Sequence, residues 1–343
     1  MRPNTNRTIH LAKTPDRKLT PEHFELREGA IPEPGDGEIL VRTLYIAIDA
    51  SDRALIQTGT YRAALQPGEV MEARILGRVI ASNHPDIAEG ELVYNPARWA
   101  DYSVLNGSDA FKVDHVEPLS AHMSMLEVTG RTAYYGLIGV ADVKAGETVV
   151  ISAAAGAVGT LACQIAKRLG CRVVAIAGGS EKCDWLEQTY GVDAAVDYKA
   201  GNLNADLKRV CPDGIDVYFD NVGGQMLETV INQMNLFGRV ACCGAVSQYD
   251  GGRAHPPANV PGLLIAKRLT MRGYLAREDE FPEIALQARE DLRNWLKTGD
   301  VAPREDIIKG LENAPDALVG LLNGENKGKR MVQVCPDTEL SLI

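Results

Sequence analysis

The feature that most constrains this chain is a glycine-rich turn between an apolar run and a helix-like run. Residues 154–159 read AAGAVG, preceded by TVVISA and followed by TLACQIAKRLG. A dinucleotide pyrophosphate is bound by such a turn, because backbone N–H groups and the positive end of a helix dipole meet its charge. Gly156 allows close approach of the backbone and Gly159 allows the helix to pack on a sheet, while Ala154 replaces the usual first glycine. We therefore predict a dinucleotide site; the alternative is a turn that only packs.

Strand-like and helix-like segments alternate around this turn. We expect strands over 148–153, 171–177, 194–197, 215–220, 239–244 and 269–276, with helices over 160–169, 183–190, 203–210 and 225–235. Apolar runs such as RVVAIA are nearly continuous, as in strands buried on both faces. The pattern predicts an α/β fold with a doubly wound parallel sheet, a Rossmann domain.

The segments on either side of this region differ from it. Short β-like runs at 38–48, 74–81, 92–94 and 99–104 are separated by glycine and proline, which predicts a small, mostly β domain. Helices are expected at 281–298 and 314–322, and a last strand at 330–334. The 343 residues suit two domains.

Charge and composition exclude several classes of protein. Lys and Arg number 36 against 46 Asp and Glu, a net charge of −10, so nucleic acid and anionic membrane surfaces are poor partners. Apolar stretches stop short of the ~20 residues that span a bilayer, and the N-terminus lacks a signal-peptide core. The seven cysteines form no C-x-x-C pair and suit a reducing compartment. We expect a soluble cytoplasmic protein.

The second expected strand ends in a segment that bears on the choice of nicotinamide cofactor. An NAD site places an acid about 20 residues beyond the turn, whereas this chain has Gly178-Gly179-Ser180-Glu181-Lys182. The glycines leave room for a 2′-phosphate, which Lys182 and Ser180 would bind. NADP(H) is favoured; Glu181 as a displaced NAD-type acid and Lys182 as a plain surface lysine remain alternatives.

Metal and hydrolytic chemistry find no support in the sequence. Residues 30–110 contain no cysteine and one histidine, His84, so the ligands of a catalytic zinc are missing from the first domain. No metal is expected. There is also no G-x-S-x-G elbow of a hydrolase.

Hydride transfer without a metal requires an acceptor that is already electrophilic. A carbon–carbon double bond conjugated to a carbonyl qualifies, because a hydroxyl can stabilise and protonate the enolate that hydride addition forms. Tyr249 follows the fifth expected strand, near the carboxyl edge where the nicotinamide belongs. Its phenolic hydroxyl is the candidate donor; a loop tyrosine without chemistry is the alternative.

The chain resembles the zinc-independent medium-chain dehydrogenases/reductases, in the branch of prostaglandin and alkenal reductases and bacterial curcumin reductase. The resemblance extends over nearly the whole chain and is carried by PGDGEILVRTLY, SNHPD, TAYYGL, AAAGAVG, AGGSEKC, GIDVYFDNVGG, CGAVSQY and GLENAPDALVGLLNGENKGK. It implies a GroES-like β-barrel domain, residues 1–125 plus 300–343, and a Rossmann NADP-binding domain, residues 126–299. It also implies an NADPH-dependent reductase of α,β-unsaturated ketones and aldehydes, and a homodimer.

The resemblance implies further site residues. The turn with Ala157 and Val158 binds the pyrophosphate, and Tyr198 joins Ser180 and Lys182 at the adenosine-phosphate end. The remaining cofactor contacts are Asn221, Cys243, Gly244, Ala245, Val246, Ser247, Tyr274, Leu275 and Asn326. Tyr249 stands where the family has its proposed proton donor, and Tyr61 resembles a second tyrosine facing the substrate.

Two segments depart from the family pattern beside the expected substrate pocket. Where the family reads D-P-Y-M-R, this chain has Asp49-Ala50-Ser51-Asp52-Arg53, and a G-M-P-G stretch has become Glu127-Val128-Thr129-Gly130, followed by Arg131. Ser51, Asp52, Glu127 and Arg131 make the pocket more polar, and Arg53 is retained. We therefore expect a smaller or more polar enone or enal as substrate.

Two other functions compete with enone reduction. NADPH-dependent quinone reduction would need the tyrosine less, and a cofactor-binding scaffold without redox activity would not need it at all. The edge of the last expected strand, LTMRGYLA, is where the resemblance places the homodimer contact.

Overall fold

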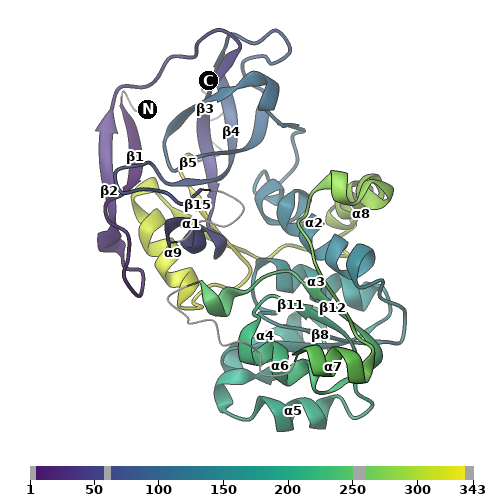
Figure 1. Ribbon diagram of the computed structural model, residues 1–343. Helices are drawn as coiled ribbons and strands as arrows, with labels where there is room; N and C mark the ends of the chain where they lie inside the picture. Colours follow the sequence, from purple (N-terminus) through teal and green to yellow (C-terminus); the bar gives the residue numbers. More distant parts are fainter. Residues whose placement is uncertain (1–4, 58–62, 250–259, 337–343) are drawn as a thin grey trace. The chain divides into compact units, whose positions relative to one another are not determined.

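The computed structural model describes residues 5–57, 63–249 and 260–336 (Figure 1). Contacts divide the chain into two compact units. The first unit comprises Met1–Met123, Glu305–Glu325 and Arg330–Ile343, and the second comprises Ser124–Arg304 and Asn326–Lys329. The domain boundaries expected from the sequence, 1–125 plus 300–343 and 126–299, remain a prediction.

The second unit contains a six-stranded parallel sheet. Its strands are β8 (Thr148–Ile151), β9 (Arg172–Ala177), β10 (Ala194–Asp197), β11 (Ile215–Asp220), β12 (Met234–Cys242) and β13 (Thr270–Gly273). The order β10-β9-β8-β11-β12-β13 reverses direction at β8, as in a doubly wound dinucleotide fold. The predicted α/β class with a parallel sheet is confirmed.

Helices connect and cover these strands (Figure 1). They are α3 (Ala157–Arg168), α4 (Ser180–Tyr190), α5 (Leu203–Val210), α6 (Gly224–Ile231) and α7 (Val260–Lys267). Helix α3 packs against α4, and α6 packs against both α5 and α7. Since crossovers between parallel strands are right-handed, these two groups cover opposite faces. The central strands are accordingly buried on both faces, and Val150, Val174 and Tyr218 have no exposed surface.

Strand β12 begins five residues earlier than expected. The sequence predicts a helix to Asn235, but α6 ends at Ile231 and β12 starts at Met234. A register irregularity separates the pairs Ile215–Met234 and Val217–Arg239, and Phe237 has a left-handed backbone, φ 64°. The extra residues of such a bulge interrupt the regular alternation of side chains between the two faces of the sheet. The hydropathy pattern therefore does not reveal the bulge.

The first unit contains a mostly antiparallel sheet ordered β14-β15-β3-β4-β5-β7, with β6 also paired to β3. Its strands are β3 (Glu38–Ala47), β4 (Glu72–Ser82), β5 (Leu92–Arg98), β6 (Tyr102–Asn106), β7 (Lys112–Val113), β14 (Glu305–Lys309) and β15 (Lys329–Gln333). Because β15 pairs with β3, the end of the chain returns to complete this sheet.

Several elements of the chain carry no strong sequence signal. Strands β1 (Asn6–Leu11) and β2 (Phe24–Gly29) form a hairpin, and β2 is exposed along most of its length, so it lacks an alternating pattern. Helix α1 (Ser51–Gln57) has seven residues, too few for a helical period. The remaining helices are α2 (Val128–Tyr134), α8 (Pro282–Thr298) and α9 (Ala314–Leu322). The last two match the expected helices closely.

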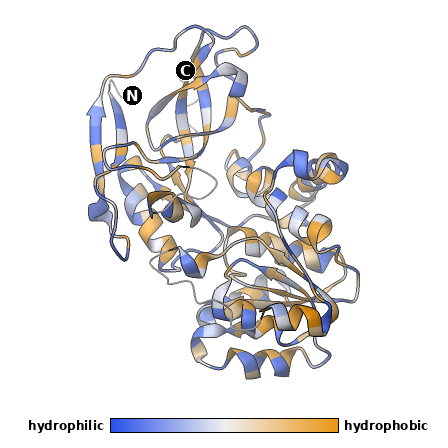
Figure 2. Ribbon diagram, viewed as in Figure 1, coloured by the Kyte–Doolittle hydropathy of each residue, from blue (hydrophilic) through white to orange (hydrophobic). Residues whose placement is uncertain are grey.

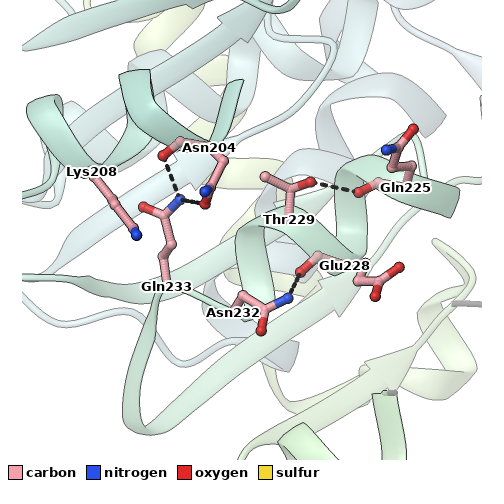
Figure 3. Close-up of a pocket in the computed structure, with 7 residues that line it drawn as sticks. All are labelled: Asn204, Lys208, Gln225, Glu228, Thr229, Asn232 and Gln233. Carbon is pink, nitrogen blue, oxygen red and sulfur yellow. Dashed lines mark hydrogen bonds between the residues drawn. The ribbon is translucent and has the colours of Figure 1, made fainter. Parts of the chain in front are cut away.

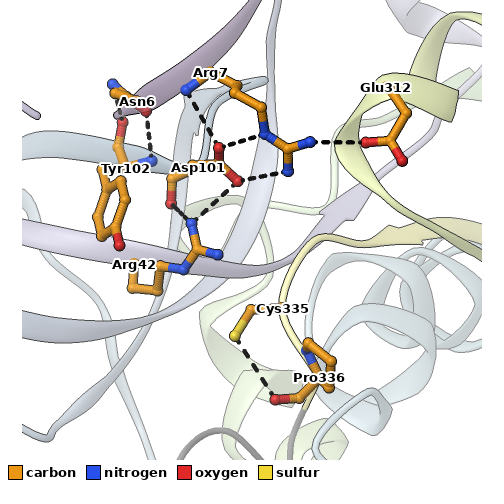
Figure 4. A network of polar contacts seen from close by, with 8 residues as sticks. All are labelled: Asn6, Arg7, Arg42, Asp101, Tyr102, Glu312, Cys335 and Pro336. Carbon is orange, nitrogen blue, oxygen red and sulfur yellow. Dashed lines mark hydrogen bonds and ion pairs between the residues drawn. The ribbon is translucent and has the colours of Figure 1, made fainter. Parts of the chain in front are cut away.

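A buried ion-pair network joins the elements of the first unit (Figure 4). Asp101, with a fully buried side chain, pairs with Arg7 at 2.8 Å and with the buried Arg42 at 3.1 Å. Arg7 also bonds the exposed Glu312 at 3.0 Å. Since Arg7 is on β1, Arg42 on β3 and Glu312 just before α9, the network connects the hairpin to β3 and to the segment that precedes α9.

No helix in the described part of the chain is both long and apolar enough to cross a membrane.

Candidate cofactor-binding and active site

The glycine-rich turn lies between β8 and α3 in the second unit. Ala153 takes a left-handed backbone, φ 47°, and the N–H of Gly156 bonds its carbonyl at 2.9 Å. A Cβ on Gly159 would lie 2.3 Å from that same oxygen, so only glycine fits there. The first N–H groups of α3, on Ala157, Val158 and Gly159, have no acceptor within the helix. A helix N-terminus with such N–H groups favours an anion.

A C-terminal segment lies across this turn. We call Asn326–Lys329 the strap; contacts assign it to the second unit. The N–H of Gly328 donates to the carbonyl of Ala155 at 2.8 Å, and Gly328 pairs with Gly156 in a parallel bridge. Inside the strap, the buried Asn326 side chain donates to the carbonyl of Gly328 at 2.8 Å. The strap therefore holds Asn326 beside the turn.

The corner between β9 and α4 collects the residues predicted for the 2′-phosphate. Helix α4 starts at Ser180, and Lys182 Nζ donates to the carbonyl of Asn326 at 2.6 Å. A Cβ on Gly178 would lie 2.9 Å from the ring of Tyr198, so the ring covers that glycine. The backbone N–H of Gly179 bonds Asp197 Oδ1 at 2.7 Å. Tyr198 and the start of α4 thus meet at one corner of the second unit.

Asn221 is fixed in the loop that follows β11. Its side chain donates to the carbonyl of Ser152 at 2.7 Å, and its backbone N–H bonds Ser152 Oγ at 2.9 Å. The buried Asp220 beside it accepts hydrogen bonds from the N–H groups of Val222 and Gly223, each at 2.9 Å. Burial raises the pKa of Asp220, although these donors act to lower it. Ser152 and Asp220 are not among the residues predicted from the sequence; the available signal for Asp220 is an acid at the carboxyl end of an apolar strand.

Residues 243–249 form the neighbouring loop, after β12. The N–H groups of Cys243 and Gly244 donate to the carbonyl of Asp220 at 2.8 and 3.0 Å. The N–H of Val246 bonds Asn221 O at 3.2 Å, and Ser247 Oγ bonds Val222 O at 2.7 Å. The structure thus brings the predicted segment 243–247 together with Asn221.

Tyr249 lies half-buried at the end of this loop, after the short helix Val246–Gln248. Its phenolic oxygen accepts a hydrogen bond from the backbone N–H of Ala245 at 3.2 Å. Because the oxygen is the acceptor in this contact, the hydroxyl proton can be donated elsewhere.

Tyr274 and Leu275 follow β13. The Tyr274 hydroxyl donates to the carbonyl of Thr132 at 2.7 Å, and burial raises its pKa well above the ordinary value. A Cβ on Gly136 would lie 2.2 Å from that hydroxyl, so Gly136 makes room for it. Leu275 is 42% exposed.

Glu127 and Arg131 pair with each other in the second unit. Arg131 Nη2 lies 2.7 Å from Glu127 Oε2, and Arg131 also contacts Glu278, which Arg289 binds in turn. Burial alone would raise the pKa of Glu278, but hydrogen bonds and charge from the two arginines lower it. The two charges expected in the substrate pocket are therefore part of a four-residue network.

The other predicted pocket residues lie in the first unit. Ser51 is exposed at the start of α1, and Asp52 accepts a hydrogen bond from the N–H of Asp49 at 2.9 Å. The buried Arg53 donates to the carbonyl of Arg17 at 2.8 Å. Tyr61 lies outside the described residues.

A separate polar pocket of about 510 Å³ lies between α5 and α6 (Figure 3). No predicted site residue lines it; its lining is Asn204, Lys208, Gln225, Glu228, Thr229, Asn232 and Gln233. Gln233 donates to the side chain and carbonyl of Asn204 at 2.7 and 2.9 Å, so part of the lining is already paired. Across the described residues, no three His, Cys, Asp or Glu side chains form a group able to hold a metal ion.

Known proteins match both parts of the chain. Residues 7–113 match the family model described as the N-terminal domain of oxidoreductase, and residues 157–290 match that of the zinc-binding dehydrogenases. The NADPH-dependent curcumin reductase of Escherichia coli (strain K12) is 37% identical over 338 residues, 97% of this chain and 98% of the relative. The chain belongs to the medium-chain dehydrogenase/reductase family. It falls in the branch of the curcumin, prostaglandin and alkenal reductases.

Other members of this reductase branch agree. The 2-alkenal reductase (NADP(+)-dependent) of Nicotiana tabacum is 40% identical over 309 residues, 89% of each chain. The crystal structure of CurA in complex with NADPH from Vibrio vulnificus has a TM-score of 0.90 at 36% identity. It covers 96% of this chain and 99% of its own. The resemblance expected from the sequence is confirmed at the level of the family and its fold.

Proposed function

We propose that this chain is an NADPH-dependent reductase of the carbon–carbon double bond of α,β-unsaturated ketones and aldehydes. The observation that carries the proposal is the corner where the glycine-rich turn, Lys182 and the strap are joined by hydrogen bonds. Two relatives of 37% and 40% identity support it, one named an NADPH-dependent curcumin reductase and the other an NADP(+)-dependent 2-alkenal reductase.

The residues of the second unit fit a phosphorylated dinucleotide. The open N–H groups of Ala157, Val158 and Gly159 suit the pyrophosphate, because a helix N-terminus favours anions. Ser180, Lys182 and Tyr198 would hold the 2′-phosphate by a charge and hydroxyl hydrogen bonds. Gly179 places no side chain at this corner, and no described residue beyond its chain neighbours has an atom within 4 Å of where its Cβ would be, which leaves space for the phosphate.

The loops after β11, β12 and β13 would hold the nicotinamide end. Bound NADPH supplies a hydride from its nicotinamide. Asn221 is pre-positioned by Ser152, and the strap positions Asn326. The backbone of residues 243–247, which is hydrogen-bonded to residues 220–222, completes the set with Tyr274 and Leu275.

Tyr249 would manage the charge that develops on the substrate. When a hydride adds to the β-carbon, electron density moves to the carbonyl oxygen, and an enolate forms. The Tyr249 hydroxyl donates a hydrogen bond or its proton to that oxygen. The N–H of Ala245, already bonded to the phenolic oxygen, stabilises the negative charge left on Tyr249.

We propose that the ion pair of Glu127 and Arg131 borders the substrate. Glu127 stands where the family pattern has a glycine, so the pair adds charge to this segment, which favours small or polar enones over long alkyl chains. A steady-state comparison of enones of increasing chain length tests this. Highest catalytic efficiency with long-chain alkenals would contradict it.

We also propose a cytoplasmic homodimer. Strand β13 is the edge of its sheet and is mostly exposed, and the neighbouring α7 is apolar along most of its length with Ile265 78% exposed (Figure 2). Unpaired edges and apolar helix faces are the surfaces that a second copy covers. Light scattering after gel filtration should give twice the 37.1 kDa chain mass; a mass of one chain would contradict the dimer.

Loss of NADPH absorbance with a simple enone tests the function. We expect turnover with the enone and formation of the saturated carbonyl compound. Activity with quinones alone would favour the quinone-reductase alternative, and tight NADPH binding with no turnover of either class would favour a scaffold.

A further inference from the structure

Two opposite charges face each other beside the corner that would hold the 2′-phosphate. Lys327 Nζ lies 2.6 Å from Glu181 Oε1, and the Glu181 side chain is 85% exposed. Hydrogen bonding and charge from Lys327 lower the pKa of Glu181, so the acid is ionised at neutral pH. An ionised acid therefore stands between Ser180 and Lys182, the two residues assigned to the phosphate.

Lys327 is delivered to this place by the strap. The residues on either side of it are fixed, since Asn326 accepts from Lys182 and Gly328 donates to Ala155. Its ammonium also lies 5.8 Å from the centroid of the Trp185 ring, within the range of a cation–π contact. The pairing of Lys327 with Glu181 is thus built into the fold of the second unit.

An acid at this point of a dinucleotide fold affects the choice of cofactor. In NAD sites, an acid beyond the second strand binds the ribose hydroxyls, and a negative charge there repels a 2′-phosphate. The sequence alone left Glu181 open as such an acid. In the structure the charge of Glu181 is matched by Lys327, so Glu181 does not offset the charge of Lys182.

We propose that Lys327 is a specificity-determining residue, which preserves the preference for a 2′-phosphorylated cofactor by neutralising Glu181. The inference rests on the proposed function, since it presupposes an NADP(H) site. It adds a role for two residues outside the phosphate-contacting set. Without Lys327, Glu181 acts against the phosphate and the site moves toward NADH.

Fluorescence titration of the full chain with NADPH and with NADH tests the proposal. Lys327→Met should weaken NADPH binding about three- to tenfold at low salt, as expected for a charge near a phosphate dianion. NADH binding should change less than twofold. The effect of Lys327→Met should shrink as salt is raised, because exposed charges are screened.

The Glu181→Gln variant distinguishes an effect of charge on the phosphate from a loosening of the strap. Both substitutions break the same ion pair, but removing the acid should leave NADPH binding unchanged or up to threefold tighter. The double variant should bind NADPH like the wild type. If Glu181→Gln weakened NADPH as much as Lys327→Met, the pair would only hold the strap and the proposal would be overturned.

Lys167→Met serves as the matched control. Lys167 pairs with Asp193 at 2.9 Å near the other end of α3, about 15 Å from the turn along the helix. This variant loses the same charge and should bind both cofactors like the wild type. An equal loss of NADPH affinity in Lys167→Met would mean that only net charge matters, against the proposal. A wild-type chain that binds neither cofactor would instead overturn the proposed function.

Discussion

The phenolic oxygen of Tyr249 accepts a hydrogen bond from the backbone N–H of Ala245, 3.2 Å away, within the loop that follows β12. This contact fixes the orientation of the Tyr249 ring within its own loop. The loop is held in turn by hydrogen bonds to Asp220 and Asn221. A proton donor for an enolate needs this kind of fixed position.

Replacement of Tyr249 by Phe should lower kcat with an enone by about 10²–10³, the usual effect of removing one oxyanion donor. NADPH binding should stay within about threefold, and quinone reduction should fall less than enone reduction. Tyr190→Phe, in the last turn of α4, is a control that should keep full activity. A loss below threefold in Tyr249→Phe would remove this hydroxyl from the mechanism.

The two glycines of the turn should respond differently to alanine. A Cβ on Gly159 would meet the backbone of Ala153 and Ala154 at 2.3 and 2.7 Å, so Gly159→Ala should destabilise the fold by about 2–3 kcal/mol. At Gly156 the nearest atom would be 3.1 Å away, and the backbone suits any residue. Gly156→Ala should therefore keep the melting temperature within a few degrees and mainly weaken NADPH binding. Thermal melts without cofactor, followed by titration, check both; equal melting temperatures for the two variants would contradict the packing argument.

Removal of the Asp101 charge should destabilise the first unit strongly. Asp101→Asn leaves the buried Arg42 without its carboxylate partner, which typically costs about 3–5 kcal/mol. Glu312→Gln breaks the exposed pair with Arg7 and should change the unfolding free energy by less than about 0.5 kcal/mol. Urea unfolding of both variants measures the difference. Similar urea midpoints for the two variants would show that the buried charge of Asp101 does not stabilise the fold.

Three thiols of the folded chain, those of Cys163, Cys242 and Cys243, should be unreactive at neutral pH. Burial raises the pKa of Cys243 and Cys163 to about 12 and that of Cys242 to about 11, so at pH 8 at most about one thiol in a thousand is ionised. Iodoacetamide should label these three slowly in the native protein and quickly in denaturant. Rapid native labelling of Cys243 would contradict its raised thiol pKa.

The same shifts predict how stability depends on pH. Since these thiol pKa values are higher in the folded than in the unfolded chain, their contribution is complete below about pH 9. It is lost as the pH rises through 11 to 12, because unfolded thiols ionise first. The unfolding free energy should therefore decline above pH 9, which urea titrations at several pH values can measure. A rise over this range would have the wrong sign.

The sequence predicts the second unit better than the first, for physical reasons. Strands such as Arg172–Ala177 are buried on both faces and leave continuous apolar runs, and the turn at Gly156 and Gly159 has a chemical signature. Strand β2 is exposed along most of its length and Phe237 lies in a bulge. Neither segment therefore has a periodic hydropathy pattern from which its structure could be predicted.

The candidate site divides in a similar way. The sequence identifies Lys182 by its spacing from the turn and Tyr249 by its place after a strand. It cannot show that Lys182 bonds the carbonyl of Asn326, 144 positions away, or that Lys327 reaches Glu181. Such pairings depend on the path of the strap, which no local pattern records.

The most direct test of the account follows the hydride itself. NADPH carrying deuterium at both C4 positions is incubated with the chain and an α,β-unsaturated ketone, and the product is examined by NMR and mass spectrometry. We predict the saturated ketone with one deuterium on its β-carbon and the second new hydrogen, at the α-carbon, from solvent. Deuterium on the carbinol carbon of an allylic alcohol would contradict the proposed function.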